Sequence, residues 1–200
     1  MVDFDVVSLP ETDHVAEGDT APDFTRPLVS DEYWEDRALA DVVDGPTLLL
    51  FHPMDGAFQG TYLYNTVDDH GWSDDVDVLG VSISTPYAHK RLLADRGDGV
   101  RIFSDPGAGV IEEYGLAHDI DGMTGVTESR PAVLLLDADR TVEHAWVASE
   151  HPEFPDAEAI DDAVADLVDC RARRSSPTHA IPARRPLAAP RPPPTVAATP

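Results

Sequence analysis

Apolar residues along the chain fall into short continuous runs, separated by stretches in which they are spaced as on a helix. A continuous apolar run of strand length is typical of a strand that is covered on both faces of its sheet. Four such strands are expected, over residues 47–51, 75–84, 100–103 and 132–136. Residues 141–147 alternate between apolar and polar side chains after a polar turn at 137–140, which indicates an antiparallel partner for the strand at 132–136.

Helical spacing predicts the elements between these strands. Helices are expected over residues 33–43, 57–69, 109–114 and 156–168, and a further helix begins at Thr85-Pro86. Gly45, Gly71 and Gly115 follow three of these segments and are typical of helix ends. Strands that alternate with helices and finish in a hairpin and a closing helix predict an α/β protein. The order is that of a thioredoxin-like fold, a central mixed β-sheet flanked by helices.

Composition divides the chain into three parts. Residues 1–17 form an acidic N-terminal lead-in, and residues 18–169 hold all the expected elements in one thioredoxin-like domain. Residues 170–200 are rich in arginine, proline and alanine and contain no acidic residue, which predicts a disordered tail because such a composition cannot bury a core. The abrupt change near Cys170 also fits a shifted reading frame, so a functional tail and a frameshift product both remain as interpretations.

The chain carries a large negative charge, with a formal net charge of −24 at pH 7. All 38 acidic residues precede Cys170, and Lys90 is the only lysine. Such a surface repels nucleic acid and anionic membranes, so neither is expected as a partner. An evenly spread carboxylate coat resembles proteins of salt-loving archaea, in which salt screens the self-repulsion. An acidic surface for a basic protein partner is the alternative.

Several classes of protein are not supported by the sequence. The chain has no run of about eighteen apolar residues, and its start lacks a basic and apolar signal region, so a soluble, cytoplasmic protein is expected. A single cysteine, Cys170, excludes an internal disulfide and fits a reducing compartment. The eight histidines show no pair at i,i+4, and no phosphate-binding glycine motif occurs, so neither a metal nor a cofactor is expected.

Five segments occur in an order that is familiar from one family. They are Ala21–Phe24, Thr47–Pro53, Val78–Ser82, Ser104–Pro106 with Tyr114-Gly115, and Ala132–Asp139. Together they resemble the peroxiredoxins, the alkyl hydroperoxide reductase/thiol-specific antioxidant family, over about residues 18–167. The resemblance implies antioxidant oxidoreductase activity, a thiol-dependent peroxidase reaction and a dimer interface.

The same resemblance places the family's active-site loop after the strand at 47–51. The family pattern is Pro-x-x-x-Thr/Ser-x-x-Cys, and its proline is present as Pro53. Ala57 stands at the hydroxyl position and Gly60 at the position of the catalytic cysteine. A peroxidatic cysteine reacts as its thiolate, and glycine has no group to ionise. We therefore expect a degenerate peroxiredoxin without thiol peroxidase activity.

Two further positions bear on this site. Pro131 occupies the slot of the family arginine, and Arg130 lies one residue earlier, where strand alternation would point it away. We expect Arg130-Pro131 to lie beside the loop at 53–60. A cis peptide bond before Pro131, as in thioredoxin-like proteins, and a trans proline that starts a strand are both open.

Two alternatives to a catalytically silent protein remain. One is an active peroxide reductase that uses Cys170, although an incidental exposed thiol is the simpler interpretation of this residue. The other is a module that binds a protein partner, of unknown identity, on the peroxiredoxin scaffold. A homodimer through the family interface is compatible with either.

Overall fold

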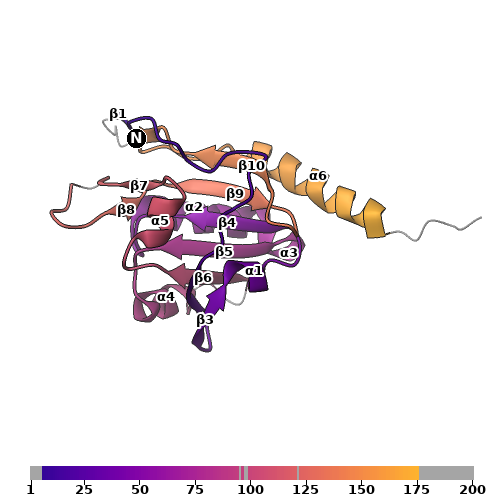
Figure 1. The fold of residues 1–200 in the computed structure, drawn as a ribbon, viewed down its shortest axis with the longest axis horizontal. Helices are drawn as coiled ribbons and strands as arrows, with labels where there is room; N and C mark the ends of the chain where they lie inside the picture. Colours follow the sequence, from indigo (N-terminus) through magenta and orange to yellow (C-terminus); the bar gives the residue numbers. More distant parts are fainter. Residues whose placement is uncertain (1–5, 95, 97–98, 121, 176–200) are drawn as a thin grey trace, which may run out of the picture.

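The structure is a computed structural model that describes residues 6–94, 96, 99–120 and 122–175. Its centre is a seven-stranded mixed sheet with the strand order β10-β9-β4-β5-β6-β2-β3 (Figure 1). Strands β4, β5 and β6 are parallel, and the other neighbours are antiparallel. The strands of this sheet are β2 (Thr25–Val29), β3 (Trp34–Ala38), β4 (Thr47–Phe51), β5 (Asp77–Ser82), β6 (Val100–Ser104), β9 (Ala132–Leu136) and β10 (Val142–Val147).

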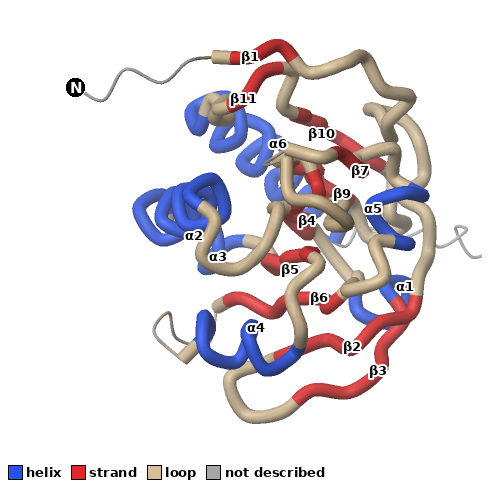
Figure 2. Tube along the Cα trace, turned by 90° about the vertical axis from the view of Figure 1, so that its left-hand side faces the viewer, coloured by secondary structure: helices blue, strands red, loops and turns tan. Residues whose placement is uncertain are grey.

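Helices cover both faces of the sheet. Figure 2 shows α2, α4 and α6 on one side, and α1 and α5 on the other. The helices are α1 (Leu39–Val42), α2 (Phe58–His70), α3 (Trp72–Asp75), α4 (Pro86–Leu93), α5 (Gly109–Glu113) and α6 (Ala157–Ser175). Side chains of β4 alternate between the two cores: Leu48 and Leu50 pack on the α2 side, and Leu49 and Phe51 on the α5 side. Burial on both faces is what makes β4 continuously apolar.

The expected strands and most expected helices are confirmed, but the helix expected at 33–43 is wrong. Residues 34–38 form the edge strand β3, which pairs with β2, and only Leu39–Val42 are helical. The apolar residues with helical spacing belong partly to the strand and partly to one helical turn. Strand pairing satisfies the backbone groups of this segment, so tertiary structure overrides the local pattern.

Both predicted domain boundaries lie within ordered structure. On the N-terminal side, β1 (Val7–Ser8) pairs with β11 (Glu150–His151), and Thr12 Oγ1 donates a hydrogen bond to Gly115 O at 2.5 Å. The lead-in therefore packs on the domain. On the C-terminal side α6 continues to Ser175, so the boundary expected at residue 169 falls inside a helix. The remainder of the expected tail, residues 176–200, lies outside the described residues.

A short hairpin completes the fold. A small hairpin joins β7 (Ala117–His118) and β8 (Glu128–Ser129). Within the described ranges no helix is both long enough and apolar enough to cross a bilayer.

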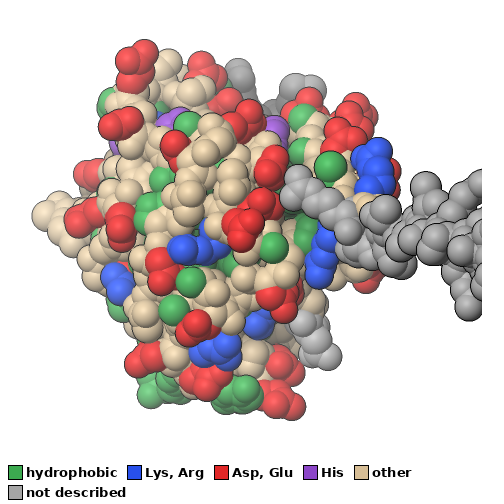
Figure 3. Space-filling model, turned by 45° about the vertical axis from the view of Figure 1, so that its right-hand side comes forward, with side chains coloured by type: hydrophobic (Ala, Val, Ile, Leu, Met, Phe, Trp, Pro, Cys, Tyr) green, Lys and Arg blue, Asp and Glu red, His purple; other side chains and the backbone are tan. Residues whose placement is uncertain are grey.

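Figure 3 shows one face of the molecule, on which Asp and Glu side chains are scattered with few Lys and Arg side chains between them. The negative charge is thus spread over this face rather than gathered in one patch.

Candidate active-site region

The region in which the resemblance to peroxiredoxins predicts the active site lies where β4 runs into α2. Residues 52–57 form this connection, in which Gly56 has a φ of +86° and so occupies the left-handed region that favours glycine. Ala57 is the N-cap residue of α2 and makes no side-chain cap hydrogen bond, because it lacks the oxygen that serine or threonine supplies. Pro53 and Gly60 are both buried. The structure thus brings the predicted positions Pro53, Ala57 and Gly60 into one loop and helix start.

The imidazole ring of His52 fills the space in front of Gly60. A Cβ atom added to Gly60 would lie 2.9 Å from Cδ2 of His52 and 3.3 Å from its Cβ and Cγ. Carbon atoms in favourable contact are about 3.5–4.0 Å apart, so the ring and a side chain at position 60 would overlap. His52 is 1% exposed, which leaves the ring no solvent to move into. A side chain at position 60 would therefore compete with His52 for the same volume.

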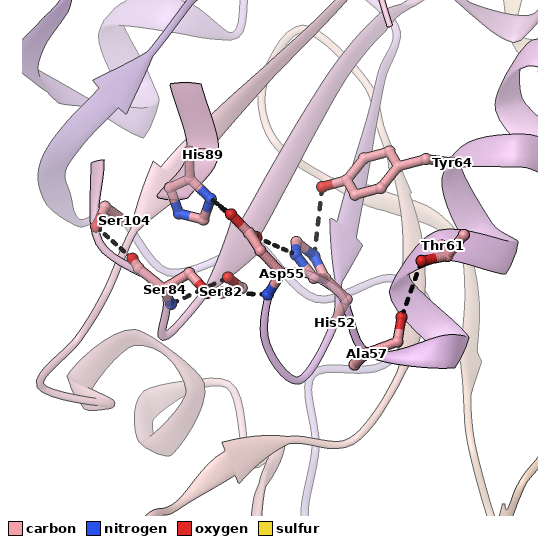
Figure 4. Close-up of polar contacts among 9 residues, drawn as sticks. All are labelled: His52, Asp55, Ala57, Thr61, Tyr64, Ser82, Ser84, His89 and Ser104. Carbon is pink, nitrogen blue, oxygen red and sulfur yellow. Dashed lines mark hydrogen bonds and ion pairs between the residues drawn. The ribbon is translucent and has the colours of Figure 1, made fainter. Parts of the chain in front are cut away.

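His52 belongs to a buried cluster around the carboxylate of Asp55, drawn in Figure 4. Nε2 of His52 lies 3.2 Å from Oδ1 of Asp55. From α4, Nδ1 of His89 lies 3.0 Å from Oδ1 and 2.9 Å from Oδ2 of the same carboxylate. An ionised carboxylate only accepts hydrogen bonds, so both imidazoles donate to it. The backbone N–H of Asp55 donates to Ser84 Oγ at 2.9 Å, which fixes the loop to the β5–α4 connection.

Tyr64 completes the environment of His52 from α2. Its hydroxyl lies 3.3 Å from Nδ1 of His52, and it donates this bond because Nε2 carries the imidazole proton. The guanidinium of Arg96 lies over the Tyr64 ring, 5.3 Å from its centroid. The Tyr64 hydroxyl packs against the backbone of Gly80 in β5, where even a methyl side chain would overlap it. Glycine at position 80 is thus a requirement for seating Tyr64.

Burial and hydrogen bonding set the charges of this cluster. Burial lowers the pKa of His52 below its usual 6.5, and the hydrogen bond to Asp55 opposes this shift only in part. Burial on its own raises the pKa of Asp55, but the hydrogen bonds from His52 and His89 outweigh it and hold the pKa at about 2. Burial raises the pKa of Tyr64 well above 10. At neutral pH the cluster therefore contains an ionised Asp55, a neutral His52 and a protonated Tyr64.

Replacing Tyr64 with phenylalanine is expected to lower the free energy of unfolding by about 1 kcal/mol, because it removes one donor and leaves Nδ1 of His52 buried without a partner. Urea unfolding at constant salt measures the difference. Tyr87→Phe is the matched control, since Tyr87 is 73% exposed and is expected to change stability by less than about 0.5 kcal/mol. Equal effects of the two substitutions would show that the His52 contact contributes nothing.

The β4–β9 register pairs Phe51 with Ala132 and so sets the backbone of Arg130-Pro131 beside the start of this loop, but the Arg130 side chain points away from it. Its guanidinium donates to Ala148 O at 3.3 Å and to Pro10 O at 3.0 Å, so it anchors the N-terminal lead-in. The register of β9 explains the direction. Ala132 packs in the core on the α5 side, and Arg130, two residues earlier, shares that face, whereas His52 packs against α2. The offset of one residue noted in the sequence thus places Arg130 on the opposite side of the sheet.

Pro131 precedes β9 with a trans peptide bond. The one cis bond within the described residues is His151–Pro152. The backbone carbonyl of Pro131 accepts a hydrogen bond from Ala148 N at 3.0 Å. Of the two alternatives drawn from the sequence, the structure has the trans proline that starts a strand.

Cys170 lies far from Gly60. It is exposed near the C-terminal end of α6 and lines a surface pocket of about 220 Å³ together with Pro46, Asp139 and Glu143. Pro46 directly precedes β4, whereas the loop that holds His52 directly follows it. The two regions are therefore separated by the length of a five-residue strand, about 16 Å. Cys170 stands at the opposite end of the sheet from Gly60.

The histidines form no metal centre in the part of the chain that the structure describes. No group of three His, Cys, Asp or Glu side chains there is arranged to hold a metal ion.

A second surface pocket, of about 410 Å³, lies between α3 and α6 and is lined by Trp72, Asp75 and Asp161. Neither pocket reaches His52 or Gly60.

Comparison with known proteins identifies the family. The model of the AhpC/TSA family matches residues 17–145, which is more than half of the chain. The chain belongs to the AhpC/TSA family. A thiol peroxidase of Staphylococcus aureus (strain MRSA252) is 31% identical over 147 residues, which cover 72% of this chain and 85% of the relative. The resemblance to peroxiredoxins is thereby confirmed.

Solved structures of AhpC/TSA-like proteins share the fold. Peroxidoxin BcpB of Mycobacterium tuberculosis superposes with a TM-score of 0.62 at 24% identity, covering 81% of this chain and 100% of that one. A thiol peroxidase of Chromobacterium violaceum gives a TM-score of 0.63 at 20% identity, covering 77% of this chain and 88% of that one. At these identities the likeness shows the fold alone, and it confirms the thioredoxin-like α/β architecture.

Sequence reasoning missed Asp55, His89 and Tyr64. Asp55 and His89 are 34 positions apart, so no local periodicity connects them. One available signal is that His52 follows β4 and His89 follows β5. Because the carboxyl ends of parallel strands meet at one edge of a sheet, two such histidines are expected to lie close together.

Proposed function

We propose that this AhpC/TSA protein does not reduce peroxides through the family's cysteine thiol and acts instead as a binding protein on the peroxiredoxin scaffold. One observation carries the proposal: the buried imidazole of His52 takes the volume into which a side chain at Gly60 would project. The position therefore lacks a nucleophile, and it also lacks the space for a nucleophile and a peroxide. We retain the cytoplasm as the proposed location and a homodimer as the proposed assembly.

The surroundings of Cys170 support the same proposal. Thiols are activated as nucleophiles at helix N-termini or beside cationic groups, and Cys170 instead lies five residues before the C-terminal end of α6. Its pocket contains the carboxylates of Asp137, Asp139 and Glu143, with Arg171 as the one cation among the lining residues. A thiolate there would face mainly negative charge. The geometry thus gives Cys170 no advantage as a substitute for the family thiol.

A surface next to the closed site supports the binding role. Tyr62 is 39% exposed on α2, and its ring centroid lies 4.2 Å from that of Phe154. Phe58, 56% exposed in the first turn of the same helix, lies 5.7 Å from Phe154 in an edge-to-face arrangement. Exposed aromatic side chains are enriched in protein interfaces. We propose that this aromatic surface, Phe58, Tyr62 and Phe154, contacts a protein partner, in the first place a second copy of the chain.

A peroxidase assay tests the catalytic half of the proposal. Hydrogen peroxide consumption with a thiol reductant is measured for the wild-type chain and for Cys170→Ser. We expect both proteins to match the protein-free rate, because neither presents a thiol at position 60. Turnover by the wild type that disappears in Cys170→Ser would overturn the proposal in favour of an enzyme that uses Cys170.

Sedimentation analysis tests the binding half. Tyr62→Ala is expected to shift the chain from dimer towards monomer by about tenfold or more in dissociation constant, as loss of a central interface aromatic residue does. Tyr87→Ala, on an exposed residue away from the aromatic surface, serves as the matched control. A wild-type chain that is monomeric at all concentrations would refute the proposed homodimer.

A further inference from the structure

We propose that Asp55, His52 and His89 form a proton latch, which holds the loop at 53–57 against α4 near neutral pH and releases it in acid. The latch would regulate access to the closed region in front of Gly60. It stands on the contacts of the three side chains and does not depend on whether the chain binds a partner.

Asp55 is the residue that fastens this loop to the rest of the domain. Across the described part of the chain, Asp55 makes all the hydrogen bonds that connect residues 53–57 to elements other than β4 and α2. Its carboxylate receives both bonds from His89, and its N–H donates to Ser84 Oγ. Ser84 is held in turn, because its carbonyl accepts a hydrogen bond from Ser104 Oγ at 2.6 Å (Figure 4). A change at one carboxylate can therefore free the loop from α4.

The cluster has little capacity for additional protons while it is closed. Nδ1 of His52 already accepts a hydrogen bond from Tyr64, so protonation there requires the hydroxyl to turn. Nε2 of His89 is fully buried and has no hydrogen-bond partner within the described residues. The free nitrogen of His52 thus opposes protonation of the closed loop.

The charged groups that face the cluster also oppose the binding of additional protons by the closed form. His52 faces Asp55 from its own loop, His89 from α4, Tyr64 from α2 and Arg96 from the segment after α4. Asp55 is the one anion among these groups. It can balance one imidazolium, but a second imidazolium would leave a buried net positive charge beside the cationic Arg96. Opening the loop relieves this charge by exposing the imidazoles to water.

The pH range follows from the direction of the pKa shifts. The pKa of His52 is lowered in the closed form by burial, whereas in the open form it is close to 6.5. The open form therefore takes up a proton that the closed form does not, so opening becomes easier as the pH falls below about 6.5. The pKa of Asp55 is about 2 in the closed form against 3.8 for the free side chain. Below about pH 4 the open form therefore binds a proton at Asp55 that the closed form does not, which lowers the stability of the closed form further.

Hydrogen–deuterium exchange of the full-length chain tests the latch. Exchange of residues 53–59, corrected for the intrinsic pH dependence of amide exchange, is compared at about pH 7 and about pH 5, which bracket the change in histidine charge. We expect the corrected exchange of the loop to rise about tenfold or more at the lower pH, as uptake of one proton by the open form allows. Exchange of strand β9 is expected to remain unchanged.

Variants assign the effect to the cluster. Asp55→Asn is expected to increase exchange of the loop already at pH 7 and to make that exchange less dependent on pH. His89→Gln keeps the Asp55 carboxylate and is expected to reduce the pH dependence of loop exchange as well. His70→Gln is the matched control, since it breaks a partly exposed histidine–aspartate pair with Asp161 at 2.8 Å. It is expected to leave loop exchange as in the wild type.

Three outcomes would overturn the latch. They are loop exchange that does not change between the two pH values, an increase that extends equally to β9 and so reports global unfolding, and full pH dependence in both Asp55→Asn and His89→Gln. Slow exchange of β9 also shows that a variant is folded. If one of the two variants fails to fold, the loop exchange of the remaining variant tests the latch.

Discussion

Alanine in place of Asp105 is expected to lower the free energy of unfolding by about 3 kcal/mol, through loss of a buried carboxylate with three hydrogen bonds. Asp105 is fully buried at the end of β6. Oδ1 accepts from Nε of Arg26 at 2.7 Å, and Oδ2 accepts from the backbone N–H of Val110 at 2.7 Å and of Ile111 at 3.4 Å. Alanine would leave two buried N–H groups at the start of α5 without an acceptor.

Two variants frame this measurement, which is made by urea unfolding at constant salt. Asp105→Asn keeps an acceptor and loses the charge, so its effect should be smaller than that of alanine. Asp162→Ala, on the exposed surface of α6, is expected to change stability by less than about 0.5 kcal/mol. If Asp105→Ala were no more destabilising than Asp162→Ala, the carboxylate would not hold α5 in place.

Cysteine in place of Gly60 is expected to lower the free energy of unfolding by about 1–3 kcal/mol, as insertion of atoms into a packed interior does. It is also expected to give no peroxide reduction. The physical reason is the contact of 2.9 Å between a Cβ at position 60 and Cδ2 of His52, because either the new side chain or the imidazole must move. Urea unfolding and a peroxidase assay measure the two effects.

The double change His52→Ala with Gly60→Cys tests this cause. Removing the imidazole makes room for the new side chain, so the two substitutions together should destabilise by less than the sum of their separate effects. Ala94→Cys, a cysteine placed at the exposed C-terminal cap of α4, controls for the thiol itself. A Gly60→Cys protein as stable as the wild type would show that His52 does not obstruct the position.

The sequence predicted the centre of the sheet well and its edge poorly. The strands at 47–51 and 132–136 were predicted to the residue, because burial on both faces leaves apolar side chains at every position except Thr47. The edge hairpin of β2 and β3 was not foreseen. Pro27 argues against a central strand, yet it is tolerated because β2 pairs with β6 only at Leu28 and Val29, beyond the proline.

The candidate site was predicted in part for similar reasons. The family pattern placed Pro53, Ala57 and Gly60 at one loop and helix start, since that pattern is local in sequence. The pattern could not show that His52 fills the space at Gly60, or that His89 reaches Asp55 from another element. These contacts depend on how separate segments pack against each other, which the spacing of residues along the sequence does not indicate.

The exclusion between His52 and a side chain at position 60 has a consequence for any redesign of this protein. A substitution that introduces a thiol at position 60 meets an occupied space, and a change at His52 alone leaves Asp55 and Tyr64 without a shared partner. Each of these single substitutions is therefore expected to give a less stable protein. A thiol at this position requires coordinated changes at positions 52 and 60.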